Sequence, residues 1–250
     1  MKPGTLYGIG IGPGDPELIT LKGARLIGAC RHLFVPKART ASESVALAIA
    51  RPLVRPEARV EELLFPMTAD REALAEKWDA AAARVAEVLA AGEDACFLTL
   101  GDPLLYSTYI YLLRALRQRL PELEVVTVPG IMAFGAAAAR AEFPVGEGSH
   151  PVTIVPAADD LAAVRRALAA GGTVVLMKIG KRLPELLALL EGERLLGKSV
   201  FVSRATMADE RIETDLRRLK AEAAEAGYLS IILVHAGEGP KDPPSAAGKA

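Results

Sequence analysis

The chain has 250 residues, which is enough for one large domain or two small ones. It is 51% hydrophobic but only 5% aromatic, so its core must rest on Ala, Leu, Val and Ile. This favours helices packed on sheets over a small β-barrel. The net charge of -1 excludes a global attraction to nucleic acid or to an anionic membrane, so any anionic ligand must be met by local Lys and Arg.

Features typical of secreted, membrane or metal proteins are missing from the sequence. No apolar run reaches the ~18 residues that favour a membrane-spanning helix, and no signal-peptide pattern is present, so we expect a cytoplasmic protein. Cys30 and Cys96 form no spaced pair and are expected to be buried, reduced thiols. The histidines His32, His150 and His235 are scattered, so no metal site is expected.

Short apolar segments alternate with segments of helical periodicity along the chain. Strands are predicted at residues 5–12, 32–36, 59–64, 94–100, 124–128, 152–156, 172–178, 199–203 and 228–235. The first helix is expected to begin at Pro16, with Asp15 as its N-cap. Further helices are predicted at residues 42–50, 70–91, 104–120, 131–141, 161–170, 183–190 and 216–225.

This alternation predicts an α/β fold. A break in the pattern near residues 121–144 suggests two α/β domains, which we expect at residues 1–125 and 126–238. The last segment, residues 239–250, is polar and rich in Pro and Gly, so we expect a disordered tail.

The glycine-rich segment Gly8–Asp15 invites comparison with nucleotide-binding loops. The dinucleotide fingerprint G-x-G-x-x-G fails, because Pro13 or Asp15 stands where its last glycine should be. A P-loop fails because no Gly-Lys-Ser/Thr ending is present. Two interpretations stay open: a tight strand-to-helix turn, or a loop lining a pocket in which glycines allow close approach.

A second glycine-containing turn, Gly101-Asp102-Pro103, follows the buried strand predicted at 94–100. Ligands of open α/β sheets bind at the carboxyl ends of strands, where this turn would lie. Gly101 permits close backbone approach. Asp102 could accept hydrogen bonds from an amine or a ribose, or could simply cap the helix after it.

A third turn of the same kind, Val128-Pro129-Gly130-Ile131, follows the strand predicted at 124–128. Two strand-to-helix turns about 30 residues apart can face the same crevice of an α/β sheet. Tyr106 and Tyr109 add aromatic surface near the second turn, although their spacing also fits a stripe of core residues.

Taken together, these segments resemble the tetrapyrrole (corrin/porphyrin) methylase family. The matching segments follow the family's order and are Gly8–Asp15 with Leu18–Thr20, Leu100–Pro103, Val128–Ile131, Val174–Lys178, Ser203–Thr206 and Ser230–Val234. The match covers residues 4–236, roughly. One Gly-Asp-Pro would be a weak signal, whereas several segments in register are specific.

Within this family the chain is most similar to the enzymes that methylate C20 of precorrin-2 or of its cobalt complex. The markers are Leu64–Thr68, Leu104–Thr108, Ser203–Met207 and Glu210. Other ring methylases usually carry Gly-Gly-Asp and a later Gly-Arg, whereas this chain has Leu100 before Gly101 and Ser107-Thr108 further on. The resemblance therefore implies a role in cobalamin biosynthesis.

The resemblance also implies a cofactor and an assembly. It implies two α/β domains with S-adenosylmethionine bound in the cleft between them, and a homodimer. The residues that match the family's cofactor contacts are Pro13, Leu100, Gly101, Asp102, Leu105, Met132, Ala133, Met177 and Ala205. The family usually has Thr or Ser where this chain has Met132, so any contact there must come from the backbone or the thioether.

The implied chemistry asks mainly for alignment of an electron-rich ring carbon with an already activated methyl group. A base must also remove one proton, and Asp102, Tyr106 and Tyr109 are candidates by position only. The acetate and propionate arms of a tetrapyrrole are anionic. Candidate partners for them, each with the alternative of a solvated surface charge, are Lys37, Arg39, Arg140, Lys178 and Arg204.

Other functions stay open at this point. The chain could methylate another corrin or porphyrin ring carbon, or act on a protein as a diphthine-type methylase. It could also be a non-catalytic module that binds S-adenosylmethionine or a tetrapyrrole. The sequence leaves open whether the substrate carries cobalt.

Overall fold

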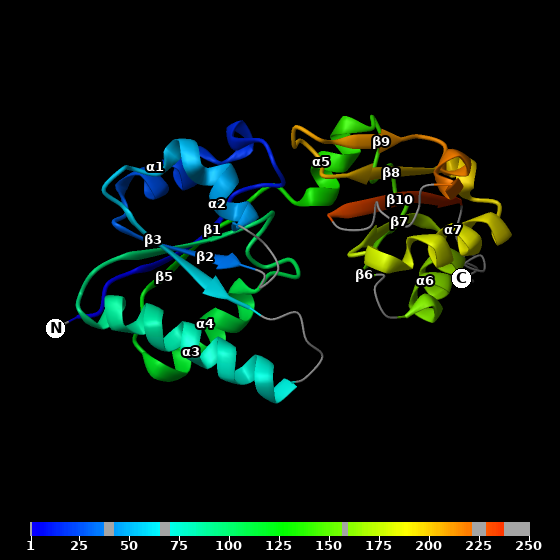
Figure 1. The fold of residues 1–250 in the computed structure, drawn as a ribbon. Helices are drawn as coiled ribbons and strands as arrows, with labels where there is room; N and C mark the ends of the chain where they lie inside the picture. Colours follow the sequence, from blue (N-terminus) through cyan, green and yellow to red (C-terminus); the bar gives the residue numbers. More distant parts are fainter. Residues whose placement is uncertain (1, 38–42, 66–70, 157–159, 222–228, 238–250) are drawn as a thin grey trace, which may run out of the picture. The chain divides into compact units, whose positions relative to one another are not determined.

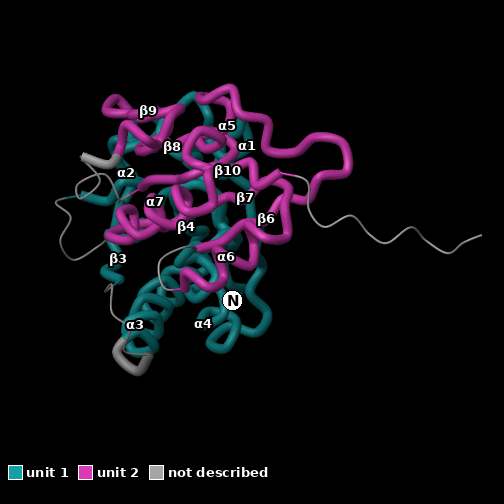
Figure 2. The backbone as a smooth tube through the Cα atoms, turned by 90° about the vertical axis from the view of Figure 1, so that its right-hand side faces the viewer, with its two compact units in different colours: residues 1–133 teal, residues 134–250 magenta. Residues whose placement is uncertain are grey.

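The computed structural model of the chain describes residues 2–37, 43–65, 71–156, 160–221 and 229–237 (Figure 1). It divides into two compact units, Met1–Ala133 and Phe134–Ala250 (Figure 2). The boundary expected at residues 125 and 126 falls within the strand Val125–Val128, which pairs with the first sheet. The predicted tail at 239–250 lies outside the described residues.

The first unit contains a sheet of five strands that all run parallel, in the order β3-β2-β4-β1-β5. The strands are β1 (Leu6–Gly10), β2 (His32–Lys37), β3 (Arg59–Leu64), β4 (Ala95–Thr99) and β5 (Val125–Val128). Its helices are α1 (Leu21–Ala29), α2 (Val45–Ala50), α3 (Arg71–Ala90) and α4 (Tyr109–Arg119). Helices α1 and α2 cover one face of the sheet, and α3 and α4 cover the other (Figure 1).

This covering of both faces explains the composition of the strands. A parallel sheet between two helical layers has no solvated face, so its central strands are continuously apolar. All five residues of β4 are buried, whereas the edge strand β3 is half-exposed. The core on the α3 and α4 side includes Phe34, Phe97 and Tyr109.

Two helices of the first unit begin later than the sequence pattern indicates. Asp15 caps a short 3-10 helix, Pro16–Leu18, and α1 begins only at Leu21, where the Thr20 hydroxyl accepts a hydrogen bond from the Gly23 amide at 3.1 Å. The helix expected from residue 104 begins at Tyr109, because the preceding residues form a separate turn. In both places a side chain that folds back onto the backbone interrupts an apolar pattern of helical period.

The second unit contains a mixed sheet in the order β6-β7-β10-β8-β9. The strands are β6 (Val152–Pro156), β7 (Gly172–Met177), β8 (Ser199–Ser203), β9 (Arg211–Glu213) and β10 (Ser230–Gly237). The helices are α5 (Ala133–Arg140), whose first residue closes the first unit, α6 (Leu161–Ala170) and α7 (Leu183–Gly192). Its short 3-10 helices are Gly180–Arg182, Leu196–Lys198 and Leu216–Ala221, and the first unit has one more at Arg51–Leu53.

The second sheet departs from the sequence prediction at its far end. Strand β9 has only three residues, too few for an alternating pattern to be recognised. The helix expected at 216–225 is a 3-10 helix over its described part, Leu216–Ala221. Among the described residues, no helix combines the length and the apolar character needed to cross a membrane.

Strand direction decides where ligands can be held in each unit. The carboxyl ends of all five strands of the first sheet meet at one edge. In the second sheet β7 and β8 both run antiparallel to β10, so their carboxyl ends share an edge with the start of β10. Met177 and Ser203 end these two strands there.

Candidate functional site

Three glycines from three strand ends are packed against one another at the carboxyl edge of the first sheet. We call this cluster, Gly10, Gly101 and Gly130, the glycine junction. A Cβ atom on Gly10 would lie 2.6 Å from the Gly101 carbonyl oxygen, and one on Gly130 would lie 2.1 Å from the same oxygen. Since no real Cβ atom tolerates such contacts, glycine is the only residue that fits at these two positions.

Backbone hydrogen bonds fix two of these turns to each other. The Gly101 amide donates to the Gly12 carbonyl at 2.8 Å, and the Gly12 amide donates to the Gly101 carbonyl at 3.3 Å. Both residues have positive φ, 75° for Gly12 and 68° for Gly101, which favours glycine. The glycine-rich start of the chain is therefore part of a junction with the Gly-Asp-Pro turn, as well as a tight turn in its own right.

Asp102 fastens the second turn to the third. One carboxylate oxygen accepts a hydrogen bond from the Leu104 amide at 2.8 Å, and the other accepts one from the Gly130 amide at 3.1 Å. The residue is only 9% exposed. The second bond brings the two turns into direct contact, and both carboxylate oxygens have backbone partners.

A buried hydroxyl pair shapes the chain between Asp102 and α4. The hydroxyls of Ser107 and Thr99 lie 2.8 Å apart, and the Ser107 hydroxyl accepts a hydrogen bond from the Tyr109 amide at 3.1 Å. Thr108, the N-cap by position, makes no capping bond with its side chain. Ser107 therefore does the capping, which the sequence analysis did not foresee.

The three tyrosine and aspartate candidates for a base differ greatly in exposure. Tyr109 is fully buried, its hydroxyl lies 2.9 Å from that of Thr127, and burial raises its pKa above the usual 10.0. A Cβ on Gly8 would fall 2.1 Å from its ring, so Tyr109 fills the core beneath β1 and does not face a ligand. Tyr106 is 40% exposed and has a left-handed φ of 52°.

The other residues expected to contact a cofactor in the first unit lie on the same three turns. Pro13 is buried in the first turn, while Leu100 and Leu105 are half-buried in the second. Met132 is 38% exposed, and the half-buried Ala133 begins α5. The fold thus gathers residues that are far apart in the sequence at one edge of the first sheet, around the glycine junction.

The second unit contributes two expected contacts at its own strand edge. Met177 is the half-buried last residue of β7, and Ala205, only 6% exposed, follows the end of β8. The Arg204 amide, next to Ala205, donates to the Leu229 carbonyl at 2.9 Å, just before β10 begins. Met177 and Ala205, the two expected cofactor contacts, therefore lie at the edge that the strands β7, β10 and β8 share.

Most of the basic residues considered as carboxylate partners already have acidic partners. The Lys37 amine lies 2.6 Å from Glu62, and the Arg204 guanidinium lies 2.6 Å from Asp209. Arg140 binds Glu210 at 2.8 Å. Lys178 is exposed, with a left-handed φ of 54°. Arg39 lies outside the described residues, as do Pro66, Met67 and Thr68 among the C20 markers.

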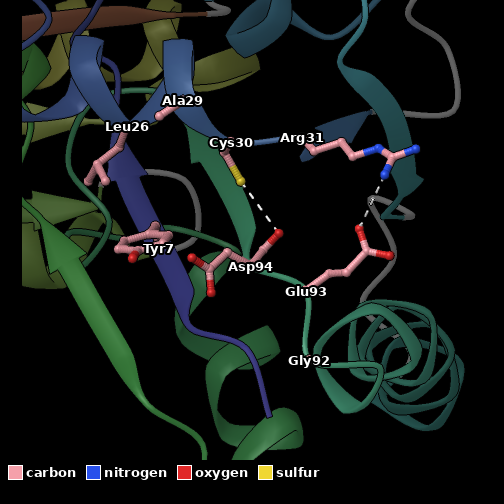
Figure 3. Close-up of a pocket in the computed structure, with 8 residues that line it drawn as sticks. All are labelled: Tyr7, Leu26, Ala29, Cys30, Arg31, Gly92, Glu93 and Asp94. Atoms are coloured by element: carbon pink, nitrogen blue, oxygen red, sulfur yellow. Dashed lines mark hydrogen bonds and ion pairs between the residues drawn. The ribbon is translucent and has the colours of Figure 1, made fainter. Parts of the chain in front are cut away.

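A separate pocket of about 390 Å³ opens at the opposite edge of the first sheet (Figure 3). Tyr7, near the start of β1, and Asp94, just before β4, both line it. The Cys30 sulfur points to the Asp94 carbonyl, 3.5 Å away, as Figure 3 shows. This pocket is at the amino ends of the strands, where ligands of parallel α/β sheets are not usually bound.

Comparisons with known proteins show which family the chain belongs to. A family model described as Tetrapyrrole (Corrin/Porphyrin) Methylases matches residues 5–220. A cobalt-precorrin-2 C(20)-methyltransferase of Salmonella typhimurium is 35% identical over 233 residues, 93% of this chain and 96% of that protein. A precorrin-2 C(20)-methyltransferase of Sinorhizobium sp is 32% identical over 241 residues, 92% and 95% of the two chains.

A solved structure extends the likeness to the fold. The uroporphyrin-III C-methyl transferase from Thermus thermophilus, complexed with S-adenyl homocysteine, gives a TM-score of 0.65 at 21% identity and covers 92% of each chain. The fold defines a two-unit α/β protein of the kind seen in this methylase structure. The chain belongs to the tetrapyrrole (corrin/porphyrin) methylase family, over 5–220 at least. It is a tetrapyrrole methyltransferase, and the fold class expected from the sequence is confirmed.

Proposed function

We propose that the chain transfers a methyl group from S-adenosylmethionine to C20 of precorrin-2 or of its cobalt complex, in cobalamin biosynthesis. Two relatives named for this reaction, at 35% and 32% identity over more than nine-tenths of the chain, carry the proposal. One is named for the cobalt substrate and the other for the metal-free one, so the proposal covers both. The related uroporphyrin-III enzyme was solved with the demethylated cofactor.

The glycine junction supports the choice of cofactor site. It packs the backbones of Gly10, Gly101 and Gly130 together with no side chain between them, and the half-exposed Met132 follows Gly130 in the third turn. We propose that the cofactor contacts are Pro13, Leu100, Gly101, Asp102, Leu105, Met132, Ala133, Met177 and Ala205. When bound, the cofactor supplies an activated methyl group on a sulfonium.

The protein itself must then align the ring carbon with the methyl group and accept the proton that is lost. The turns fixed by Asp102 hold the backbone in one geometry, so little reorganisation is needed when ligands bind. Tyr106 stays a proposed proton acceptor, because its side chain is exposed at the same turn. The role we propose for Asp102 is to hold the two turns in place, since both of its carboxylate oxygens accept backbone hydrogen bonds.

The test is incubation with precorrin-2 or cobalt-precorrin-2 and S-adenosylmethionine carrying a ¹³C methyl group. The proposal expects one labelled methyl at C20 in the carbon NMR spectrum of the product. Transfer to another ring carbon, or to a protein side chain, would replace it with one of the alternatives. Binding of S-adenosylhomocysteine without any transfer would indicate a non-catalytic module. A homodimer is part of the proposal, and light scattering of the eluting protein tests it.

A further inference from the structure

The turn that carries Ala205 has a strained backbone. Arg204 and Thr206, on either side of Ala205, both have left-handed φ values, 51° and 65°. Such a conformation is uncommon for residues other than glycine, and is an outlier for a β-branched residue such as Thr206. Strain of this kind persists only where surrounding contacts over-determine the backbone, and it gathers at functional sites.

Glu210 supplies the contact that holds this turn. One of its carboxylate oxygens accepts a hydrogen bond from the Thr206 amide at 2.6 Å. The amide of Glu210 donates to the Met207 carbonyl at 3.1 Å, and the Met207 amide donates to the Arg204 carbonyl at 2.9 Å. The Glu210 carboxylate therefore adds a third hydrogen bond to the turn at 204–210, which two backbone hydrogen bonds already stabilise.

Arg140, the last residue of α5, holds the Glu210 carboxylate in turn. Its Nε lies 2.9 Å and 3.2 Å from the two carboxylate oxygens, and its terminal nitrogen lies 2.8 Å from one of them. The Glu210 side chain is only 11% exposed, whereas Asp209 beside it is 63% exposed. The Arg140 guanidinium makes a forked contact with a carboxylate that is largely shielded from water. Such a contact fixes the orientation of the carboxylate more firmly than an exposed ion pair does.

We infer that Glu210 is a positioning residue for the cofactor, acting through the turn at Ala205, and that Arg140 orients its carboxylate. The inference rests on the proposed function, because Ala205 is a proposed cofactor contact. Arg140, a candidate partner of substrate carboxylates, thereby has a second proposed role. Its hydrogen bond also lowers the pKa of Glu210 below the usual 4.5, so the carboxylate is charged and able to accept from the Thr206 amide at neutral pH.

The experiment compares Glu210→Gln, Glu210→Ala and Arg140→Met with the matched control Asp209→Asn. The control removes the charge of the neighbouring, exposed partner of Arg204 in the same turn. Calorimetry gives the Kd for S-adenosylhomocysteine, and steady-state kinetics give KM for S-adenosylmethionine and kcat. Thermal unfolding shows which variants are folded.

We expect Glu210→Ala to raise Kd and KM about tenfold, the loss of roughly one charged hydrogen bond, with kcat at saturating cofactor nearly unchanged. Glu210→Gln keeps an oxygen for the Thr206 amide and should recover part of the affinity, and Asp209→Asn should match the wild type.

If the wild type binds the cofactor and the Glu210 variants bind it equally well, the inference alone is overturned. If the wild type does not bind the cofactor, the proposed function fails and the inference falls with it. Should Glu210→Ala fail to fold, Glu210→Gln, which conserves volume, decides the question.

Discussion

The glycine junction can pack so closely only because its residues have no side chains. Gly10 and Gly130 touch the Gly101 carbonyl so closely that an added Cβ would overlap it. Sequence reasoning singled out the three turns that hold these glycines, and placed only Gly101 among the expected cofactor contacts. It could not show that they also pack against one another, because that contact joins strand ends far apart in the chain.

Gly130→Ala should damage both stability and cofactor binding. The new Cβ would lie 2.1 Å from the Gly101 oxygen, so the second and third turns must separate, at about 1–3 kcal/mol for overpacking. Gly135→Ala is the matched control: nothing lies within 4 Å of its Cβ, and it stands within α5, where Ala is favoured by roughly 0.5–1 kcal/mol. Urea unfolding and calorimetry with S-adenosylhomocysteine measure both effects. Unchanged binding in Gly130→Ala would contradict the assignment of the site.

Asp102→Ala should weaken cofactor binding through the backbone. It leaves the Leu104 and Gly130 amides without their acceptor, at about 1–3 kcal/mol for the two bonds. Asp94→Ala is the control, because Asp94 also accepts a backbone hydrogen bond, from Thr5 at 2.7 Å, but at the opposite edge of the sheet. Both variants should lower the free energy of unfolding, and only Asp102→Ala should raise the Kd for S-adenosylhomocysteine. Equal Kd values in the two variants would remove Asp102 from the site.

Among the elements, the strands were predicted more accurately than the helix starts. Strands at 59–64, 152–156 and 199–203 have the bounds that the sequence indicates. For the last two the reason is that a short apolar run between turn residues is a local signal. Helix α4 begins at Tyr109, well after the predicted start, because Asp102 and Ser107 bind backbone amides in between. Hydrophobic periodicity does not reveal such bonds. The contact of Arg140 with Glu210 spans 70 positions and carries no local signal at all.

Ser107→Ala tests how α4 is capped. The variant loses the hydroxyl that bonds Thr99 and accepts from the Tyr109 amide, so the free energy of unfolding should fall by about 1–2 kcal/mol. Thr108→Ala, at the N-cap position but without a capping bond, should cost less than half of that. Chemical denaturation of the two variants makes the comparison. A larger loss in Thr108→Ala than in Ser107→Ala would show that the cap is assigned to the wrong residue.

At the scale of the whole molecule, three groups that titrate below pH 7 make stability depend on pH in the same direction. Hydrogen bonds from Lys37 and Arg140 lower the pKa values of Glu62 and Glu210 below the usual 4.5, and burial lowers that of His235 below 6.5. A group whose pKa is lower in the folded state binds more protons when unfolded, so acid favours unfolding. The stabilisation is present above the unfolded pKa and is lost as pH falls through the folded one.

We therefore predict that the free energy of unfolding falls as pH is lowered from 6.5, first through His235 and then, below about 4.5, through the carboxylates. Urea titrations between pH 7 and 4 measure this. Glu210→Gln should reduce the slope below pH 4.5 relative to the wild type. A free energy that stays constant or rises toward pH 4 would contradict the assigned contacts.

The site itself is tested most directly by a crystal structure of the protein with S-adenosylhomocysteine. We predict the ligand against the glycine junction, in contact with Gly101 and with the turn that Asp102 fastens to Gly130. A ligand seated instead in the pocket lined by Tyr7 and Asp94, at the other edge of the sheet, would contradict the claim that the three strand-end turns form the methyl donor's site.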